Sequence, residues 1–366
     1  MNKKKEMKKF AIIIEDMRMG GPQKQLIYFL QETLKTKSNF NYTLYVPFGT
    51  KKKLSKFLDI KKLNIKELNI HYLSMSNIIN YIIFFFKDIS LLKENLKNIE
   101  NVYIAGGSSN LKSLIISIFL KKKIFFHIHD IKSNFLIKFF LLFASRFIKK
   151  IFFASSCSKK YYSFLSNCPK KLILRSSVDP KYFIKRKYKN KFFTIGIIAN
   201  INPDKNLELF VKIVKKIHDK NIHFKIIGNL FGSQKNYFEK KLLNFSNIKN
   251  KIQWYQKIDN PIKIINSFDL LLCTSKYESL PLSIIESLSL SIPVISTDVG
   301  DVSYVLNKKK CGYVVKSNTS HFINKILKIK NNEKLKRKLS ENARKNILKN
   351  FNIKNYKYKL EREILG

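Results

Sequence analysis

Short apolar runs alternate with segments of helical periodicity along the first half of the chain. Runs typical of strands buried on both faces of a parallel sheet occur within residues 9–14, 40–48, 65–74, 101–107, 123–130 and 149–156. After the first run, Ile27, Leu30 and Leu34 lie at the spacing of one helix face. Strands that alternate with helices predict an α/β fold with a doubly wound parallel sheet.

The same alternation starts again after a polar linker, RKYKNK, at residues 186–191. Further strands are expected within residues 192–198, 223–232, 251–258, 268–275 and 291–298. With 366 residues the chain is long enough for two hydrophobic cores. We therefore place one domain in residues 1–185 and a second in 186–345, with a helical pattern from Thr319 to the end.

One stretch differs from the rest of this lysine-rich chain. Residues 277–307 contain no Lys or Arg, although the average composition predicts about six. A buried strand ends at Ser275, Pro281 suits the first turn of a helix, and Gly300 follows a second strand. Ile284, Ile285 and Leu288 give that helix an apolar face. The stretch is therefore expected to be buried or chemically constrained.

Two acidic residues of this stretch are candidates for ligand binding. Glu278 follows a strand, where ligands of open α/β sheets bind. The N-terminus of the next helix offers N–H groups to a phosphate, and Glu286, in the second turn, can face the same crevice. The alternative is one solvated helix glutamate and an unrelated loop glutamate. Only the strand–loop–Pro-helix–strand context makes the pair specific.

Glu278 and Glu286, with LPL and SIPVISTDVG around them, resemble the E-x7-E signature of retaining, nucleotide-sugar-dependent glycosyltransferases of family 4, the glycosyl transferases group 1 type. The resemblance implies the GT-B fold, in which two Rossmann-like domains face each other across a cleft. It also implies an acceptor-binding N-terminal domain, a donor-binding C-terminal domain, and a last helix, 346–366, that packs back on the first domain.

The resemblance assigns donor-binding roles in the second domain. Glu286 would receive the ribose hydroxyls, since a carboxylate accepts two hydrogen bonds at once. Glu278 would lie at the sugar, near the backbone of Leu280, Pro281 and Leu282. Lys205, in the segment PDKN, would clamp the diphosphate without an obligatory metal or other cofactor. The alternative for Lys205 is a solvated loop lysine, an important one in so basic a chain.

Other positions match the family only in part. Gly228 resembles the glycine loop near the donor. Asn200 stands where the family usually has an arginine, so part of the leaving-group charge stabilisation is in doubt. Tyr304 replaces a frequent glutamate, and Tyr255 and Asp301 replace frequent glycines.

The first domain offers two further candidates. Gly20 and Gly21 follow the first strand, and the resemblance implies that this loop faces the donor phosphate and the acceptor. The alternative is an ordinary strand–helix turn. His129 lies at the end of a strand, on the same side as His127, and resembles the family's interdomain histidine near the donor sugar. A histidine at a strand end can equally be structural.

The formal net charge is +46, from 71 basic and 25 acidic residues. Such a charge suggests anionic partners, although the abundance of Lys, Asn and Ile also fits a drift towards A/T-rich codons. The motif-bearing stretch is the least basic part, which argues against nucleic acid as a partner. Four cysteines without metal-ligand spacing indicate reduced thiols in a cytoplasmic protein.

Two apolar stretches, 81–86 and 135–154, are too short or too interrupted by Lys and Arg to span a bilayer. The basic N-terminus lacks the apolar core of a signal peptide. Residues 135–154 instead predict an interfacial amphipathic helix, and hence peripheral association with an anionic inner membrane face.

Several enzyme signatures are absent from the sequence. It contains no G-x-G-x-x-G, no Walker G-x-x-x-x-G-K, no D-x-D and no G-x-S-x-G. We expect a glycosyltransferase that uses a UDP- or GDP-sugar and a glycan or lipid-linked acceptor of polysaccharide or lipopolysaccharide biosynthesis. A GT-B protein without transfer activity, acting as a binding or scaffold partner, and a sugar-nucleotide epimerase are the alternatives, because Asn200 and Tyr304 depart from the family.

Overall fold

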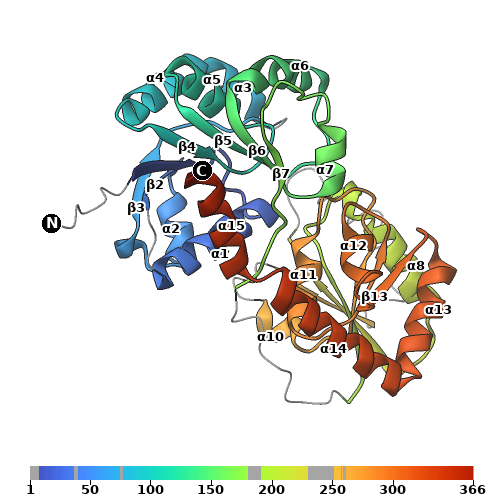
Figure 1. Cartoon of the computed structure of the whole chain (residues 1–366). Helices are drawn as coiled ribbons and strands as arrows, with labels where there is room; N and C mark the ends of the chain where they lie inside the picture. Colours follow the sequence, from blue (N-terminus) through green and yellow to red (C-terminus); the bar gives the residue numbers. More distant parts are fainter. Residues whose placement is uncertain are drawn as a thin grey trace. The chain divides into compact units, whose positions relative to one another are not determined.

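The computed structural model describes residues 8–36, 40–74, 77–179, 191–229, 251–256, 258 and 261–365. The chain forms two compact units (Figure 1). Unit 1 comprises Met1–Arg175 together with Ile353–Gly366, and unit 2 comprises Ser176–Asn352. The linker predicted at 186–191 falls, apart from its last residue, outside the described residues.

Unit 1 contains a seven-stranded, fully parallel sheet in the order β3-β2-β1-β4-β5-β6-β7. Its strands are β1 Lys8–Ile13, β2 Phe40–Pro47, β3 Asn64–Leu68, β4 Asn101–Ile104, β5 Lys123–Ile128, β6 Ile148–Phe153 and β7 Lys171–Ile173. The order reverses between β1 and β4, which is the topological switch point where open α/β sheets bind ligands.

Helices cover both faces of this sheet (Figure 1). Those of unit 1 are α1 Gly21–Lys35, α2 Thr50–Leu54, α3 Ile78–Ile83, α4 Phe85–Leu96, α5 Leu111–Phe119, α6 Phe135–Ala144, α7 Ser156–Tyr161 and α15 Ile353–Leu365, with 3-10 turns η1 Ile60–Lys62 and η3 Ser145–Phe147. α15 packs on α1. Right-handed crossovers place α4, α5 and α6 on the opposite face.

Unit 2 repeats the architecture with a six-stranded parallel sheet in the order β10-β9-β8-β11-β12-β13. Its strands are β8 Phe193–Ile198, β9 Ile222–Ile227, β10 Ile252–Tyr255, β11 Leu270–Cys273, β12 Val294–Thr297 and β13 Gly312–Val315. Its helices are α8 Leu207–Lys216, α10 Ile262–Ile265, α11 Leu282–Ser289, α12 Val302–Leu306, α13 Thr319–Lys330 and α14 Glu333–Asn350, with the 3-10 turn η5 Pro203–Lys205. Here the switch point lies between β8 and β11.

The predicted strands are confirmed, with ends that move by a few residues. β13 was missed, because its four residues begin with a glycine and are too few to give a clear apolar pattern. Pro281 lies just before α11 rather than in its first turn. The prediction that residues 277–307 are largely buried is confirmed for 280–306. In the part of the chain described, each helix is too short or too polar to cross a bilayer.

Candidate functional site

The switch point of unit 2 gathers most of the predicted donor-site residues. Asn200 and Lys205 follow β8, and Glu278 follows β11, the neighbouring strand of the sheet. Gly228 follows β9, on the other side of β8. Because parallel strands end at one edge, these residues share the carboxyl edge of the sheet.

The Lys205 ammonium and the Glu278 carboxylate form an ion pair there. Ser275 donates a hydrogen bond from Oγ to the same Glu278 oxygen, Oε1, at 3.2 Å. The side chains of Lys205 and Glu278 are 24% and 17% exposed, so solvent screens the pair only in part. The sequence analysis assigned both residues to one donor site, with Lys205 at the diphosphate and Glu278 at the sugar. Their direct contact is a new observation.

Two hydrogen bonds join the loops that follow β8 and β11, and a third lies within the loop after β8. Thr274 donates from Oγ1 to the Lys205 carbonyl oxygen at 2.9 Å, which joins the loop after β11 to η5. The Lys276 N–H donates to the Asp204 carbonyl oxygen at 2.6 Å, and the Asn202 side chain accepts from the Lys205 N–H at 3.2 Å. Sequence reasoning missed these positioning residues. The polar end of the apolar run before Ser275 is the signal that could have found them.

Helix α11 buries Glu286 almost completely. The residue is 1% exposed, and Ile284, Ile285 and Leu288 are fully buried, as the sequence predicted. Leu280 and Leu282 are buried as well, so they anchor the turn on either side of Pro281. The predicted contact between the Glu286 carboxylate and a nucleotide ribose stays a prediction.

Two glycines let the loops of this edge approach each other closely. A Cβ on Gly228 would lie 1.8 Å from the Ala199 carbonyl oxygen, so the loops after β8 and β9 meet there. A Cβ on Gly300 would lie 1.8 Å from the Ser279 carbonyl oxygen, and the residue has a φ of +51°. Gly300 therefore fixes the loop that carries Glu278. The structure thus gives Gly228 a packing role, and its contact with the donor stays a prediction.

Gly20 and Gly21 lie after β1 in unit 1, at the start of α1. Neither has a positive φ, and a Cβ on Gly21 would meet no atom within 4 Å. The fold of unit 1 therefore does not require glycine at position 21. This is the pattern expected if a ligand approaches the backbone there.

Gly21→Ala should leave the melting temperature unchanged or slightly higher, because alanine loses less backbone entropy than glycine on folding. If a ligand contacts this backbone, kcat/KM for sugar transfer should fall about tenfold or more through steric exclusion. Paired thermal melts and transfer assays measure both effects. A variant with full activity would show that the loop is only a strand–helix turn.

His129 follows β5 and lies against His127, with ring centroids 4.0 Å apart. This confirms that both rings lie on one side of the strand. Burial lowers the pKa of His129 to about 4, and it lowers the pKa of His127 well below the usual range. His127 Nδ1 is 2.7 Å from the Tyr103 hydroxyl. At neutral pH the His129 imidazole is therefore uncharged and suited to hydrogen bonding with a sugar hydroxyl.

The depressed pKa of His129 predicts a pH-dependent stability. The unfolded chain binds a proton near pH 6.5 and the folded chain only near pH 4, so this group stabilises the fold above pH 6.5 and that stability is lost as the pH falls towards 4. His129→Gln should reduce this loss in the free energy of unfolding by about 1–3 kcal/mol. This range allows for solvent screening, because the residue is partly exposed. Urea titrations of both proteins from pH 4 to 7 measure it; parallel curves would contradict it.

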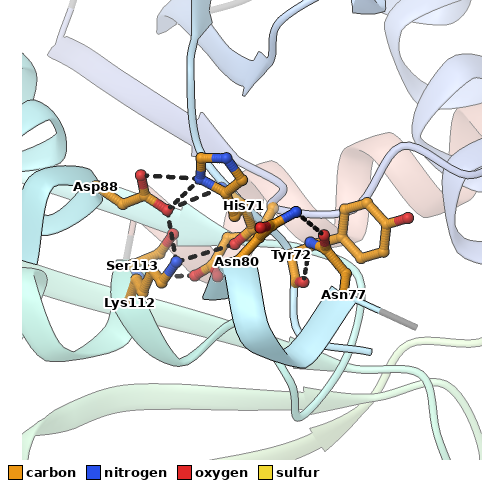
Figure 2. Close-up of polar contacts among 8 residues, drawn as sticks. His71, Tyr72, Asn77, Asn80, Asp88, Lys112 and Ser113 are labelled. Carbon is orange, nitrogen blue, oxygen red and sulfur yellow. Dashed lines mark hydrogen bonds and ion pairs between the residues drawn. The ribbon is translucent and has the colours of Figure 1, made fainter. Parts of the chain in front are cut away.

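A buried ionic cluster lies at the same edge of unit 1 (Figure 2). The Lys112 ammonium donates to Asp88 Oδ2 at 2.5 Å and to the His71 carbonyl oxygen at 3.0 Å, and both charged side chains are fully buried. The His71 N–H also donates to Asp88, at 2.8 Å. Glu15, after β1, accepts from the Ser113 N–H at 2.7 Å, and burial raises its pKa to about 7. Sequence analysis did not identify this cluster.

The family model and the sequence relatives match only part of the chain. Residues 179–346 match the family Glycosyl transferases group 1. A poly(ribitol-phosphate) alpha-N-acetylglucosaminyltransferase of Staphylococcus aureus is 27% identical over 177 residues, which are 47% of this chain and 34% of that protein. The Escherichia coli O-antigen biosynthesis glycosyltransferase WclY is 26% identical over 235 residues, 58% of this chain and 65% of that protein. The chain thus spans less than two thirds of the length of these curated relatives.

Solved structures match nearly the whole chain. Anabaena Alr3699/HepE in complex with UDP and glucose gives a TM-score of 0.83 at 12% identity, covering 98% of this chain and 99% of that one. A glycosyltransferase from Rickettsia africae ESF-5 gives 0.77 at 18% identity, covering 98% and 99%. At such low sequence identities these structural matches show the fold alone. They confirm the predicted GT-B fold class. The chain therefore has the GT-B fold, and its residues 179–346 match the glycosyl transferases group 1 family.

Proposed function

We propose that this protein is a glycosyltransferase that moves a sugar from a nucleoside diphosphate donor to an acceptor of cell-envelope glycan synthesis. The observation that carries the proposal is the Lys205–Glu278 pair at the switch point of unit 2, inside the segment that matches the family. A cation and a carboxylate at one sheet edge suit a ligand that carries both a diphosphate and hydroxyl groups.

In the proposed reaction the acceptor hydroxyl oxygen bonds to the anomeric carbon while the bond from that carbon to the diphosphate oxygen breaks. The acceptor proton passes to the departing diphosphate on the same face, so the anomeric configuration is retained. Lys205 stabilises the charge that develops on the diphosphate, and the N-terminus of α11 adds its dipole. Glu278 orients the sugar hydroxyls, and Glu286 holds the ribose. No step of the proposed reaction uses a metal ion.

Within unit 1, His129 and the Gly20–Gly21 loop are the residues that we propose to contact the substrates. The neutral imidazole of His129 would donate a hydrogen bond to the sugar, and the glycine loop would let donor or acceptor approach the backbone. Asn200 supplies a hydrogen bond but no charge in this scheme. Most of the charge stabilisation therefore falls to Lys205.

The acceptor class rests on the relatives' names. Besides the two proteins above, a UDP-Gal:alpha-D-GlcNAc-diphosphoundecaprenol alpha-1,3-galactosyltransferase of Escherichia coli is 25% identical over 173 residues, 45% of this chain and 43% of that protein. These names refer to poly(ribitol-phosphate), to O-antigen biosynthesis and to a diphosphoundecaprenol-linked sugar. We infer a glycan or lipid-linked acceptor and a UDP- or GDP-sugar donor, handled at the cytoplasmic side of the membrane.

Nucleotide binding and nucleotide release test this proposal together. UDP or GDP should raise the melting temperature, because a ligand that binds only the folded state stabilises it. Glu286→Gln, which keeps the buried shape, should abolish most of that rise. Release of the nucleoside diphosphate from its sugar donor that depends on an added lipid-linked glycan would support sugar transfer. Release without acceptor would favour the epimerase alternative, and binding without release would favour a binding or scaffold protein. No shift with any nucleotide would refute the donor site.

A further inference from the structure

One helical layer of unit 1 is apolar on its outer side as well as its inner side. α4, α5 and α6 cover one face of the sheet (Figure 1), and their inner side chains belong to one core cluster with the strands. Leu92, Leu114 and Leu141 represent the three helices in that core, and all three are fully buried. A surface helix normally shows polar residues opposite such a stripe. This layer does not.

α6 shows the feature most clearly. Ile137, Leu141 and Ala144 face the core. The opposite side presents Phe135, 77% exposed, and Phe139, 68% exposed, with Leu136 and Phe143 also exposed. Lys138 is the only charged residue of the helix. Exposing so many large apolar side chains together is unfavourable in water, so contiguous patches of this kind mark interaction sites.

α3, the start of α4 and the end of α5 add to the same layer. Ile79, Ile82 and Ile83 of α3 are exposed, as is Phe86 of α4, whose neighbour Ile89 packs towards the core. We call the exposed apolar residues of this layer the outer apolar face. It consists of Ile79, Ile82, Ile83, Phe86, Phe119, Phe135, Leu136, Phe139, Leu142, Phe143 and Phe147.

Basic side chains border the outer apolar face. The Arg146 guanidinium lies 4.5 Å from the centre of the Phe143 ring, and the Lys93 ammonium lies 5.5 Å from that of Phe119. Residues 77–149 hold eleven Lys and Arg against four Asp and Glu. Asp88 and Lys112, one residue of each sign, are buried as a pair, which leaves ten basic residues against three acidic ones. Long basic side chains beside exposed rings can keep their charge at a phosphate level while the rings enter an apolar phase.

We propose that the outer apolar face docks on the surface of an anionic lipid bilayer. Apolar rings flanked by cations match acyl chains below a layer of negative headgroups. A second copy of this chain is a poor occupant, because two faces bordered by positive charge repel each other. The proposal concerns unit 1 alone and does not depend on the transfer reaction. It extends the sequence prediction for 135–154 to α3, α4 and the end of α5.

Vesicle co-sedimentation of the full chain, without sugar donor, tests the docking. The protein should bind vesicles that contain phosphatidylglycerol at least about tenfold more strongly than pure phosphatidylcholine, because several cations contribute. The preference for phosphatidylglycerol vesicles should decrease in 0.5 M NaCl, because salt screens the attraction between the basic side chains and the anionic headgroups. The double variant Ile82→Asp/Phe139→Asp should lose about tenfold or more in binding, since each side chain forfeits its apolar burial.

Phe48→Asp is the matched control, because Phe48 follows β2, is 78% exposed and lies outside the layer. It should bind vesicles like the unmodified protein, and unchanged melting temperatures should show that both variants fold. The proposal is overturned if the unmodified protein binds neither kind of vesicle. It is also overturned if the control loses as much binding as the double variant, or if the face instead forms a dimer in light scattering that the double variant dissociates.

Discussion

Replacing Lys205 with alanine should lower kcat/KM for sugar transfer by about 10²- to 10³-fold, the loss typical when one preorganised charge-stabilising group is removed. The Lys205 ammonium is the cation paired with Glu278 at the carboxyl edge of unit 2, and Asn200 offers no charge to replace it. The loss should appear mainly in kcat, because the charge on the diphosphate grows as its bond to the sugar breaks. Steady-state kinetics with donor and acceptor both varied measure it.

Lys212→Ala is the matched control, since Lys212 is an exposed lysine of α8 in the same unit. It should keep nearly full activity and stability. Lys205→Arg keeps the charge and should retain more activity than Lys205→Ala. If Lys205→Ala and Lys212→Ala behave alike, the ion pair with Glu278 is structural and Lys205 has no part in the reaction.

Replacing Lys112 with methionine should lower the free energy of unfolding by about 3–5 kcal/mol, because the Asp88 carboxylate then remains buried without its cation. Both side chains are 0% exposed, and the Lys112 ammonium also lies 3.8 Å from the centre of the Tyr81 ring. Figure 2 shows how Lys112 connects α5 to α4 and to the loop of His71. Chemical denaturation at pH 7 measures the loss, with the unfolding of unit 1 followed separately if the units unfold in two steps.

Lys123→Met is the control, because Lys123 pairs with Glu100 and the two side chains are 53% and 61% exposed. Breaking such a surface pair should cost at most about 1 kcal/mol. Lys112→Met/Asp88→Leu should regain part of the loss, since no charge is then left buried alone. Equal effects of Lys112→Met and Lys123→Met would show that the cluster is hydrated and not a buried pair.

The sequence was sufficient for the architecture because buried parallel strands leave uninterrupted apolar runs. The runs that became β1, β8 and β11 each stand out from a lysine-rich background, and their order implies two doubly wound sheets. β13 escaped notice because a four-residue strand carries too little pattern of its own.

The sequence allowed individual residues of the candidate site to be predicted, but not the contacts between them. Glu278 was identified from its place after a strand and Lys205 from the resemblance to the glycosyltransferase family. However, 73 positions of sequence separate them, and nothing local indicates that they pair. The Asp88–Lys112 pair is the stronger case, because each residue alone looks like an ordinary charge on a helix. Long-range ion pairs depend on how strands order in space, which one sequence does not determine.

A crystal structure of the protein with UDP or GDP bound is the most direct test of the proposed donor site. We expect the diphosphate within hydrogen-bonding distance of the Lys205 ammonium and the ribose hydroxyls at the Glu286 carboxylate. A nucleotide bound elsewhere, with Lys205 still paired only to Glu278, would contradict it.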